Sequence, residues 1–296
     1  VSPSRGLGDV YKRQLQAGRA LLLLHGTFSM GQVAFHGLSK SPEFAAISER
    51  YGGRIFTFNH PSLHLSPIDN VQTMVDMLPN GIDLDLDIIT HSRGALVARI
   101  LNEQLARIEL GNRSLRVNRV VFVAAPLRGT VLADGDNWIE LIDRYTNLLT
   151  NLPDNVYTLT LEAILALVKI IGHSGLAKLV GINSMWPGGP FLQMLNSEGD
   201  HDAVYYSLSV DYRPEGGQMI ERLRNRGLDL AVDHIFGEGN DGVVPTAGCY
   251  SVEAPVCGLP IPEERRRVWS RQSDIHHINF FYNDAVNAQI AEWLTA

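Results

Sequence analysis

Short apolar segments recur along the chain at spacings that predict the strands of a buried sheet. Residues 20–24 form an uninterrupted run of alanine and leucine, as expected for a strand that is covered on both faces. In residues 83–89, leucine and isoleucine alternate with aspartate before the segment becomes wholly apolar, which is typical of a strand entering such a sheet. Further strands are predicted at 54–58, 119–126, 204–210, 228–236 and 268–270.

Helical patterns separate these strands. After Gly94 the apolar residues return at helical spacing as far as Ile108, so one face of a helix is expected to pack on the sheet. Further helices are predicted at 42–51, 70–78, 220–226 and 284–294. Repeated strand–helix units predict an α/β fold with a mostly parallel sheet, right-handed crossovers, and ligands bound beyond the carboxyl ends of the strands.

One long stretch departs from this alternation. Residues 131–196 contain apolar helical segments and a return rich in glycine and proline at 184–191, and the pattern requires no strand there. We predict a helical cap laid over the strand ends, with extra helices on the flank of the sheet as the alternative. Residues 15–296 are predicted to form a single domain that carries this insertion.

Residues 1–14 do not continue the pattern. They begin without methionine and are similar to the peptide produced when a sequencing adaptor is translated, so they are predicted to be non-native and are excluded from the fold. The natural amino terminus is then expected to be missing, and cytoplasmic localisation is only the default.

Composition narrows the choice of partners. The chain has 296 residues, of which 45% are hydrophobic, and a net charge of −7, so it can bury a large core and is not expected to bind nucleic acid. Its longest apolar stretch, residues 159–171, contains Glu162 and Lys169 and is shorter than the ~20 residues of a membrane span, so no transmembrane segment is predicted. Cys249 and Cys257 lack metal-ligand spacing and are expected to be free thiols, with one local disulfide as the alternative.

Candidate chemistry begins at the turn between the strand at 83–89 and the helix after Gly94. Ser92 lies at this bend, in the sequence Thr-His-Ser-Arg-Gly. A sharp strand-to-helix turn exposes the serine oxygen above the strand ends, where the amide of Arg93 at the start of the helix can stabilise an oxyanion. Gly94 permits the close approach, although Thr90 stands where the G-x-S-x-G pattern has its first glycine. We therefore predict that Ser92 is a nucleophile.

The first strand ends in a His-Gly turn that can complete the oxyanion site. Gly26 permits a tight turn, and the amide of Thr27 is expected to point into the space above the sheet. His25 is predicted to hold the loop backbone. His60 and His64 follow the next strand and are expected to be backbone partners or cleft lining, with the role of base as the alternative.

The acid and the base are expected downstream of the serine, in that order. Asp241 lies in a glycine-rich loop before Val-Val-Pro, a setting that presents a carboxylate able to orient an imidazole. Asp211 is the main alternative and Asp233 a weaker one. For the base we prefer His277, because it directly precedes an apolar segment able to anchor its loop, whereas His276 is expected to face solvent.

Five segments of the chain carry a family resemblance when they are taken together. In the order HGTFS, THSRG, VVFVAAPLRGT, NDGVVP and DIHHINFF, they resemble the α/β-hydrolase superfamily and, within it, bacterial lipase-like and esterase-like serine hydrolases. The resemblance runs from about residue 20 to the end of the chain. It implies Ser92 as nucleophile, Asp241 as acid, His277 as base, and the backbone N–H groups of Thr27 and Arg93 as oxyanion donors. It also implies a lid in the insertion that follows VVFVAAPLRGT.

The implied reaction is hydrolysis of a small-molecule or lipid ester through an acyl-enzyme, with no metal or organic cofactor. Acyl transfer to an alcohol or a lipid is the alternative on the same residues. A catalytically silent module that binds a partner protein or a lipid is the alternative from another class. The oligomeric state and the acyl-chain preference do not follow from the sequence.

Overall fold

A computed structural model describes most of the predicted domain. The described residues are 15–134, 137, 144, 179–197, 199, 201–212, 238–254, 256 and 258–296. The segment at 1–14, most of the predicted cap, and the helix and strand predicted at 220–226 and 228–236 lie outside these residues, as do Asp233 and Cys257. The predictions for those segments stay predictions.

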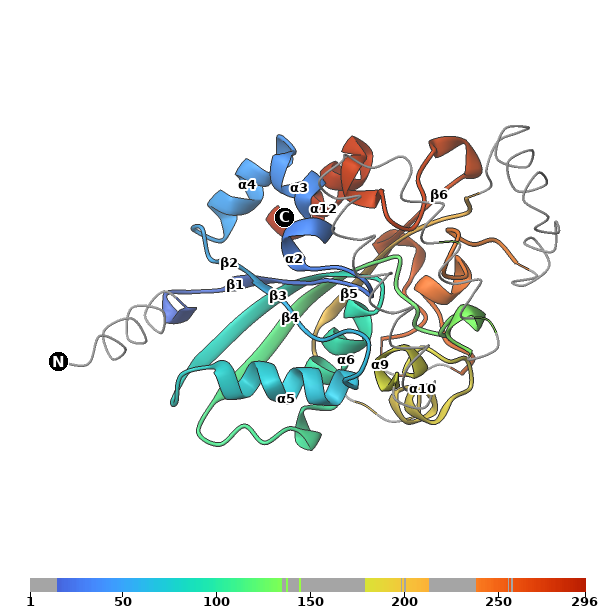
Figure 1. Ribbon diagram of the computed structural model, residues 1–296. Helices are drawn as coiled ribbons and strands as arrows, with labels where there is room; N and C mark the ends of the chain where they lie inside the picture. Colours follow the sequence, from blue (N-terminus) through green and yellow to red (C-terminus); the bar gives the residue numbers. More distant parts are fainter. Residues whose placement is uncertain are drawn as a thin grey trace.

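A parallel sheet forms the centre of the fold (Figure 1). Within the described residues its six strands lie in the order β2-β1-β3-β4-β5-β6, and every neighbouring pair is parallel, as predicted. The strands are β1 (Ala20–Leu24), β2 (Ile55–Phe58), β3 (Asp83–His91), β4 (Ser114–Val123), β5 (Val204–Val210) and β6 (Arg266–Trp269). The carboxyl ends of β1, β3 and β4 are in register, so the loops that follow them leave the sheet at one edge.

Helices cover both faces of the sheet, which explains why β1 has no polar position. Alternate side chains of β1 pack against opposite layers, because successive residues of a strand point to opposite faces. One layer contains α5 (Pro67–Met77) and α6 (Gly94–Glu103). The other contains α3 (His36–Lys40), α4 (Glu43–Arg50) and α12 (Asp284–Thr295), and Figure 1 shows the two layers on either side of the sheet. The short helix α2 (Gly31–Ala34) precedes α3.

The start of α5 differs from the prediction for a local reason. The helix begins at Pro67, ahead of the predicted Asn70, because Ser66 caps it. The Ser66 hydroxyl accepts the N–H of Asp69, and the Asp69 carboxylate accepts the N–H of Ser66. Proline at the first helical position needs no N–H donor and has a suitable φ. With this early start Asn70 lies inside the helix, where it is buried.

Two other element ends also differ. α6 ends at Glu103, before the predicted Ile108, and a 3₁₀ turn follows at Leu105–Arg107. Ile108 is nevertheless buried in the same apolar cluster, so the helical spacing of apolar residues continues beyond the helix itself. β4 begins at Ser114, ahead of the predicted start at Arg119, because the chain already pairs with β3 from that residue.

The described return of the insertion contains two short helices, α9 (Val180–Asn183) and α10 (Pro190–Leu195). Both carry buried apolar residues that belong to the cluster on the α5 and α6 side of the sheet. The return is therefore packed against the body of the domain and lies next to α6 in Figure 1.

Two predictions from composition, one on membrane-spanning helices and one on the cysteines, can be compared with the described part of the chain. No helix in this part has the length and apolar character needed to cross a membrane. Cys249 is a buried free thiol.

Candidate active site

Ser92 stands at a strained turn between β3 and α6. Its φ angle is +52°, a left-handed conformation that is uncommon for a residue other than glycine. Its amide N–H donates to the carbonyl oxygen of Val123 at 2.9 Å, which ties the turn to the end of β4. The turn is thus stabilised by its neighbours, and it places the serine just past the carboxyl end of β3.

Two glycines allow this turn to pack closely. A Cβ atom on Gly94 would collide with the carbonyl oxygen of Leu24, and one on Gly26 would lie 2.6 Å from the Cβ of Ser92. Thr90 is fully buried within β3, where it pairs with Leu24. The close packing beside the serine therefore depends on Gly26 and Gly94, and Thr90 is accommodated inside the sheet.

Ser92, His277 and Asp241 form one hydrogen-bonded chain, and all three side chains are buried. The Oγ of Ser92 lies 3.0 Å from Nε2 of His277, and Nδ1 of His277 lies 2.7 Å from Oδ2 of Asp241. Oδ1 of Asp241 accepts the N–H groups of Val243 and Val244 at 2.9 and 2.7 Å. The amide of His277 donates to the carbonyl oxygen of Asp241 at 2.9 Å, so backbone as well as side-chain contacts join the two loops.

The alternative acid and bases do not join this chain of hydrogen bonds. Oδ1 of Asp211 is buried without a hydrogen-bond partner among the described residues, and the carboxylate lies against Gly239. His64 is exposed on the loop after β2. His60 is buried, but its backbone N–H and its ring are used in the contacts with His25 described below.

The expectation that His276 faces solvent is wrong. Its side chain is fully buried, and its ring packs against the edge of Tyr212 with the ring centroids 5.5 Å apart. Within the described residues neither ring nitrogen has a hydrogen-bond partner, and burial lowers the pKa of this imidazole to about 4. The reason is that the whole loop is anchored in the core through Ile275, Phe280 and Phe281, so both histidines are carried inside.

His25 and His60 form a stacked pair beside the turn after β1, with ring centroids 4.1 Å apart. Nε2 of His25 accepts the backbone N–H of His60 at 3.1 Å, so the proton of the neutral ring is on Nδ1, which donates to the carbonyl oxygen of Gly26 at 2.8 Å. Burial lowers the pKa of His25 to about 4 and that of His60 well below its ordinary value. These contacts join the loops after β1 and β2, which is the backbone-holding role expected of His25.

His91 makes a contact that the sequence reasoning did not identify. Its Nε2 donates to the carbonyl oxygen of His277 at 2.7 Å, and the two rings have centroids 5.1 Å apart. His91 therefore links the end of β3 to the backbone of the loop that carries His277. The sequence feature that could have pointed to this contact is a histidine at the buried end of a strand, directly before the serine.

Two backbone amides flank Ser92 from different segments. Thr27 belongs to the turn whose Gly26 packs on Ser92, and Arg93 follows Ser92 directly. Within the described part of the chain, neither the Thr27 nor the Arg93 amide N–H has a hydrogen-bond acceptor. Unpaired amides beside a buried hydroxyl are suited to bind a negatively charged oxygen.

The described ends of the insertion lie on either side of this arrangement. At its start, the Thr130 hydroxyl donates to the carbonyl oxygen of Val243 at 2.6 Å, in the loop that carries Asp241. At its return, the carbonyl oxygen of Gly181 accepts from Nε of Arg93 at 2.7 Å. Both ends of the inserted segment are therefore fixed next to residues of the site.

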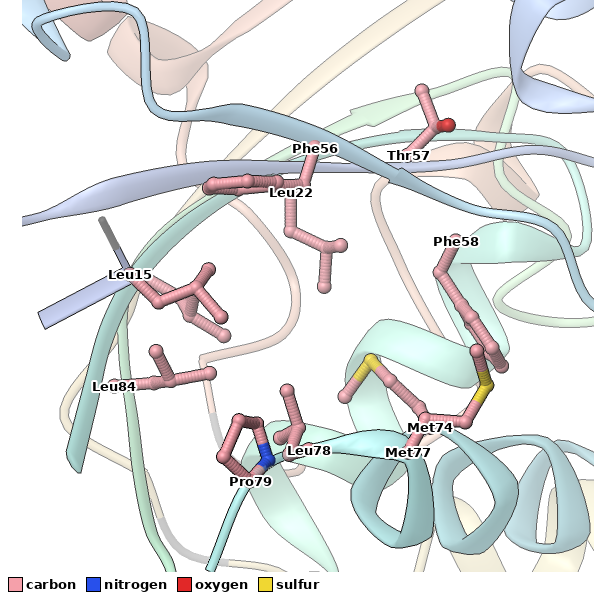
Figure 2. Close-up of a pocket in the computed structure, with 11 residues that line it drawn as sticks. Leu15, Leu22, Phe56, Thr57, Phe58, Met74, Met77, Leu78, Pro79 and Leu84 are labelled. Carbon is pink, nitrogen blue, oxygen red and sulfur yellow. The ribbon is translucent and has the colours of Figure 1, made fainter. Parts of the chain in front are cut away.

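An apolar pocket of about 340 Å³ lies on the α5 side of the sheet (Figure 2). Its lining comes from β1, β2, β3 and α5 and includes Leu22, Phe58, Met74 and Leu86. Leu86 precedes Ser92 by six residues, which corresponds to roughly 20 Å at the rise of an extended strand. The pocket also reaches Phe58 at the carboxyl end of β2, so it extends along the strands toward the edge of the sheet that carries the serine.

We predict that the free energy of unfolding falls as the pH drops from about 6.5 to about 4. Burial lowers the pKa values of His25, His91 and His276 to about 4, 3 and 4, whereas an unfolded histidine titrates near 6.5. Below pH ~6.5 the imidazoles of the unfolded chain therefore bind protons that the buried imidazoles of the folded protein do not. Stability is lost until the pH reaches the pKa values of the folded protein. The loss is expected to be on the order of a few kcal/mol.

Urea unfolding between pH ~7 and pH ~5 measures this loss. His91→Gln is the matched variant, because glutamine can donate a hydrogen bond but does not titrate in this range. It should show a smaller loss of stability over the same pH interval. An identical pH dependence in the two proteins would contradict the prediction.

The chain aligns with several solved structures. Lipase 1 from Pelosinus fermentans aligns with a TM-score of 0.55 and 15% identity, over 94% of this chain and 98% of that chain. Lipase BlEst2 from Bacillus licheniformis in its mature form aligns with a TM-score of 0.48 and 14% identity, over 94% and 92% of the two chains. Phospholipase PlaB from Legionella pneumophila aligns with a TM-score of 0.44 and 14% identity. The alignment covers 78% of this chain but only 45% of the length of that protein. No curated protein matches the chain by sequence.

The parallel strand order, the helices on both faces and the serine at a strand-to-helix turn define an α/β-hydrolase fold. The fold that the resemblance implies is therefore confirmed. The chain belongs to the family described as "Domain of unknown function (DUF7379)", whose model matches residues 5–295.

Proposed function

We propose that this protein is a serine hydrolase that cleaves carboxylic esters through an acyl-enzyme. The observation that carries the proposal is the hydrogen-bonded chain from Ser92 through His277 to Asp241 at the carboxyl edge of the sheet. The unpaired amides of Thr27 and Arg93 beside the serine add the donors that such a reaction needs. The proposed site therefore combines a nucleophile, a base, an acid and an oxyanion hole.

In the first half of the proposed reaction, Ser92 Oγ attacks the carbonyl carbon of the ester while Nε2 of His277 takes the hydroxyl proton. Asp241 accepts the proton on Nδ1 of His277 in a hydrogen bond, so Nε2 presents its lone pair to the serine. The same carboxylate stabilises the imidazolium that forms. The carbonyl oxygen becomes an oxyanion between the amides of Thr27 and Arg93.

In the second half, the tetrahedral intermediate collapses and the alcohol leaves with the proton returned from His277. The acyl group is then bound to Ser92 as an ester. Water attacks this ester as His277 removes its proton, and collapse of the second intermediate releases the carboxylic acid and restores the serine hydroxyl.

We place the lid of this enzyme in residues 131–196. The support comes from the described ends of the segment, since Thr130 contacts the loop of Asp241 and Gly181 contacts Arg93. A segment fixed at both ends beside the site can cover the strand ends and line the acyl-binding surface. We therefore favour esters with an apolar acyl chain as the substrate class.

Two measurements on the wild-type protein test the proposal. Turnover of p-nitrophenyl acetate, butyrate, octanoate and laurate is expected, and a fluorophosphonate probe should label Ser92, as located by mass spectrometry of the digested protein. A protein that neither labels nor turns over any ester would contradict the proposal and favour a silent binding module. An added alcohol that is converted to its ester, in place of free acid, would assign acyl transfer.

Asp241→Asn should lower kcat for these esters by about 10⁴-fold. Asparagine keeps the shape of the side chain but no longer has the negative charge that orients His277 and stabilises its protonated form. Asp211→Asn is the matched control, because Asp211 follows β5 and was the rival acid in the sequence. A comparable fall in kcat for Asp211→Asn, or a fall below tenfold for Asp241→Asn, would assign the acid differently.

A further inference from the structure

The side chain of Arg93 is fully buried and contacts three separate segments. Its Nε donates to the carbonyl oxygen of Gly181 at 2.7 Å, its Nη1 to Oδ1 of Asn70 at 3.0 Å, and its Nη2 to the carbonyl oxygen of Leu65 at 2.6 Å. One guanidinium thus joins the start of α6 to α5, to the loop before α5, and to α9 at the return of the insertion, three elements that lie together in Figure 1.

The charge of this guanidinium has no counter-ion among the described residues. The three acceptors are two carbonyl oxygens and one amide oxygen, and none of the ion pairs in this part of the chain includes Arg93. Burial lowers the pKa of Arg93 to about 9, so the side chain is still a cation at neutral pH.

A buried charge of this kind is costly to the fold. Transfer of a cation from water to the interior is unfavourable unless an opposite charge compensates it, and here hydrogen bonds to neutral groups provide the compensation. The buried Arg99 is a contrast within the same helix, because it forms an ion pair with Glu103 at 2.7 Å. An unpaired charge directly after the proposed nucleophile therefore suggests a role in the reaction.

The charge of Arg93 acts on the two histidines beside the turn after β1. After burial, which is the largest cause, the charge of Arg93 contributes to the low pKa values of His25 and His60. His25 is hydrogen-bonded to Gly26, whose backbone packs on Ser92, and Thr27 follows directly. The turn that carries the proposed donor Thr27 thus lies within the field of this cation.

We propose that Arg93 is a positioning residue whose unpaired, buried charge stabilises the oxyanion and whose three contacts hold the surrounding segments in place around Ser92. The inference rests on the function proposed above. It adds a role for the side chain to the one proposed for the backbone N–H of the same residue. A fixed charge in a site that excludes water is effective because it needs no reorganisation when the negative charge develops.

The charge can be compensated without removing any contact of Arg93. In Asn70→Asp, a carboxylate replaces the amide oxygen that already accepts from Nη1 of Arg93, so the guanidinium gains a counter-ion. Asn70→Ala is the matched control. Both variants lose the contact from Nδ2 of Asn70 to the carbonyl oxygen of Pro61, but only Asn70→Asp adds a negative charge.

We expect Asn70→Asp to lower kcat for p-nitrophenyl esters by about tenfold or more relative to Asn70→Ala, with little change in KM. A purely structural role predicts the reverse order, because aspartate preserves the contact with Arg93 and alanine removes it. Equal kcat values in the two variants, or a higher kcat in Asn70→Asp, would overturn the proposal.

A second pair of variants changes Arg93 itself. Arg93→Lys keeps the charge but not the forked geometry, and Arg93→Met keeps most of the apolar length but neither charge nor donors. The kcat of Arg93→Met should be at least about tenfold below that of Arg93→Lys. Equal losses in the two variants would leave only a structural role and would overturn the charge effect. If either variant fails to fold, the Asn70 pair still decides the question.

One readout is independent of turnover. Because the charge of Arg93 contributes to the low pKa of His25, the pKa of that imidazole, measured by NMR, should be higher in Asn70→Asp than in Asn70→Ala. Wild-type protein that neither labels with a fluorophosphonate nor hydrolyses esters would refute the proposed function. The imidazole titration would then test the field of Arg93 by itself, and identical pKa values in the two variants would overturn it.

Discussion

Replacing Ser92 with alanine should lower kcat for p-nitrophenyl esters by about 10⁶-fold, and labelling by a fluorophosphonate should disappear. The serine Oγ is the atom that lies 3.0 Å from Nε2 of His277, and the proposed oxyanion donors are the amides of Thr27 and Arg93. Without this oxygen no acyl-enzyme can form. The variant can then only bind the ester and stabilise the oxyanion while water attacks it directly, and this accelerates hydrolysis weakly.

A second buried serine provides the control for this variant. Ser207 lies in β5, is fully buried, and donates from its Oγ to the carbonyl oxygen of Cys249 at 2.8 Å. Ser207→Ala removes a comparable hydroxyl and should reduce stability by about 1 kcal/mol while kcat changes by no more than a few fold. Retention of ester turnover by Ser92→Ala would mean that another residue is the nucleophile.

Replacing His277 with alanine should be almost as damaging, with kcat lower by about 10⁵- to 10⁶-fold. Among the described residues, the imidazole is the group that contacts both the Ser92 hydroxyl and the Asp241 carboxylate, so its loss removes the proposed base and isolates the proposed acid.

His276 is the matched control for the base. It adjoins His277 in the chain and is equally buried, yet within the described residues its ring has no hydrogen-bond partner. His276→Ala should therefore change kcat by less than about tenfold, although removal of a buried ring from its contact with Tyr212 should reduce stability by about 2 kcal/mol or more. Loss of turnover in His276→Ala, with turnover retained in His277→Ala, would reverse the assignment.

The strands of the sheet could be predicted because their signal is local. The leucines of β1 mark a strand that is buried on both faces and has no polar position, and the alternation of leucine with aspartate marks the start of β3, whose first aspartates are not buried. The helices α2 and α3 could not be predicted in this way. They contain four and five residues, which is too short for a helical period to be seen.

The candidate site was predictable to different degrees. Ser92 follows from a strand, a turn and a helix that are adjacent in the chain, and the downstream order of acid and base follows from the family resemblance. The side-chain roles of His91, Asn70 and Arg93 were not visible, because each depends on contacts with a segment far away in the sequence. The burial of His276 was missed for the same reason.

The sequence by itself determined the parallel α/β architecture and the position of the serine, because apolar periodicity and turn chemistry act over a few neighbouring residues. Only the tertiary structure decided which histidine reaches Ser92 and which aspartate supports it, since those partners are 185 and 36 residues apart. It also decided that Arg93 is a buried cation without a counter-ion among the described residues. Side-chain direction, burial and local field depend on the packing of distant segments, and that packing exists only in the folded chain.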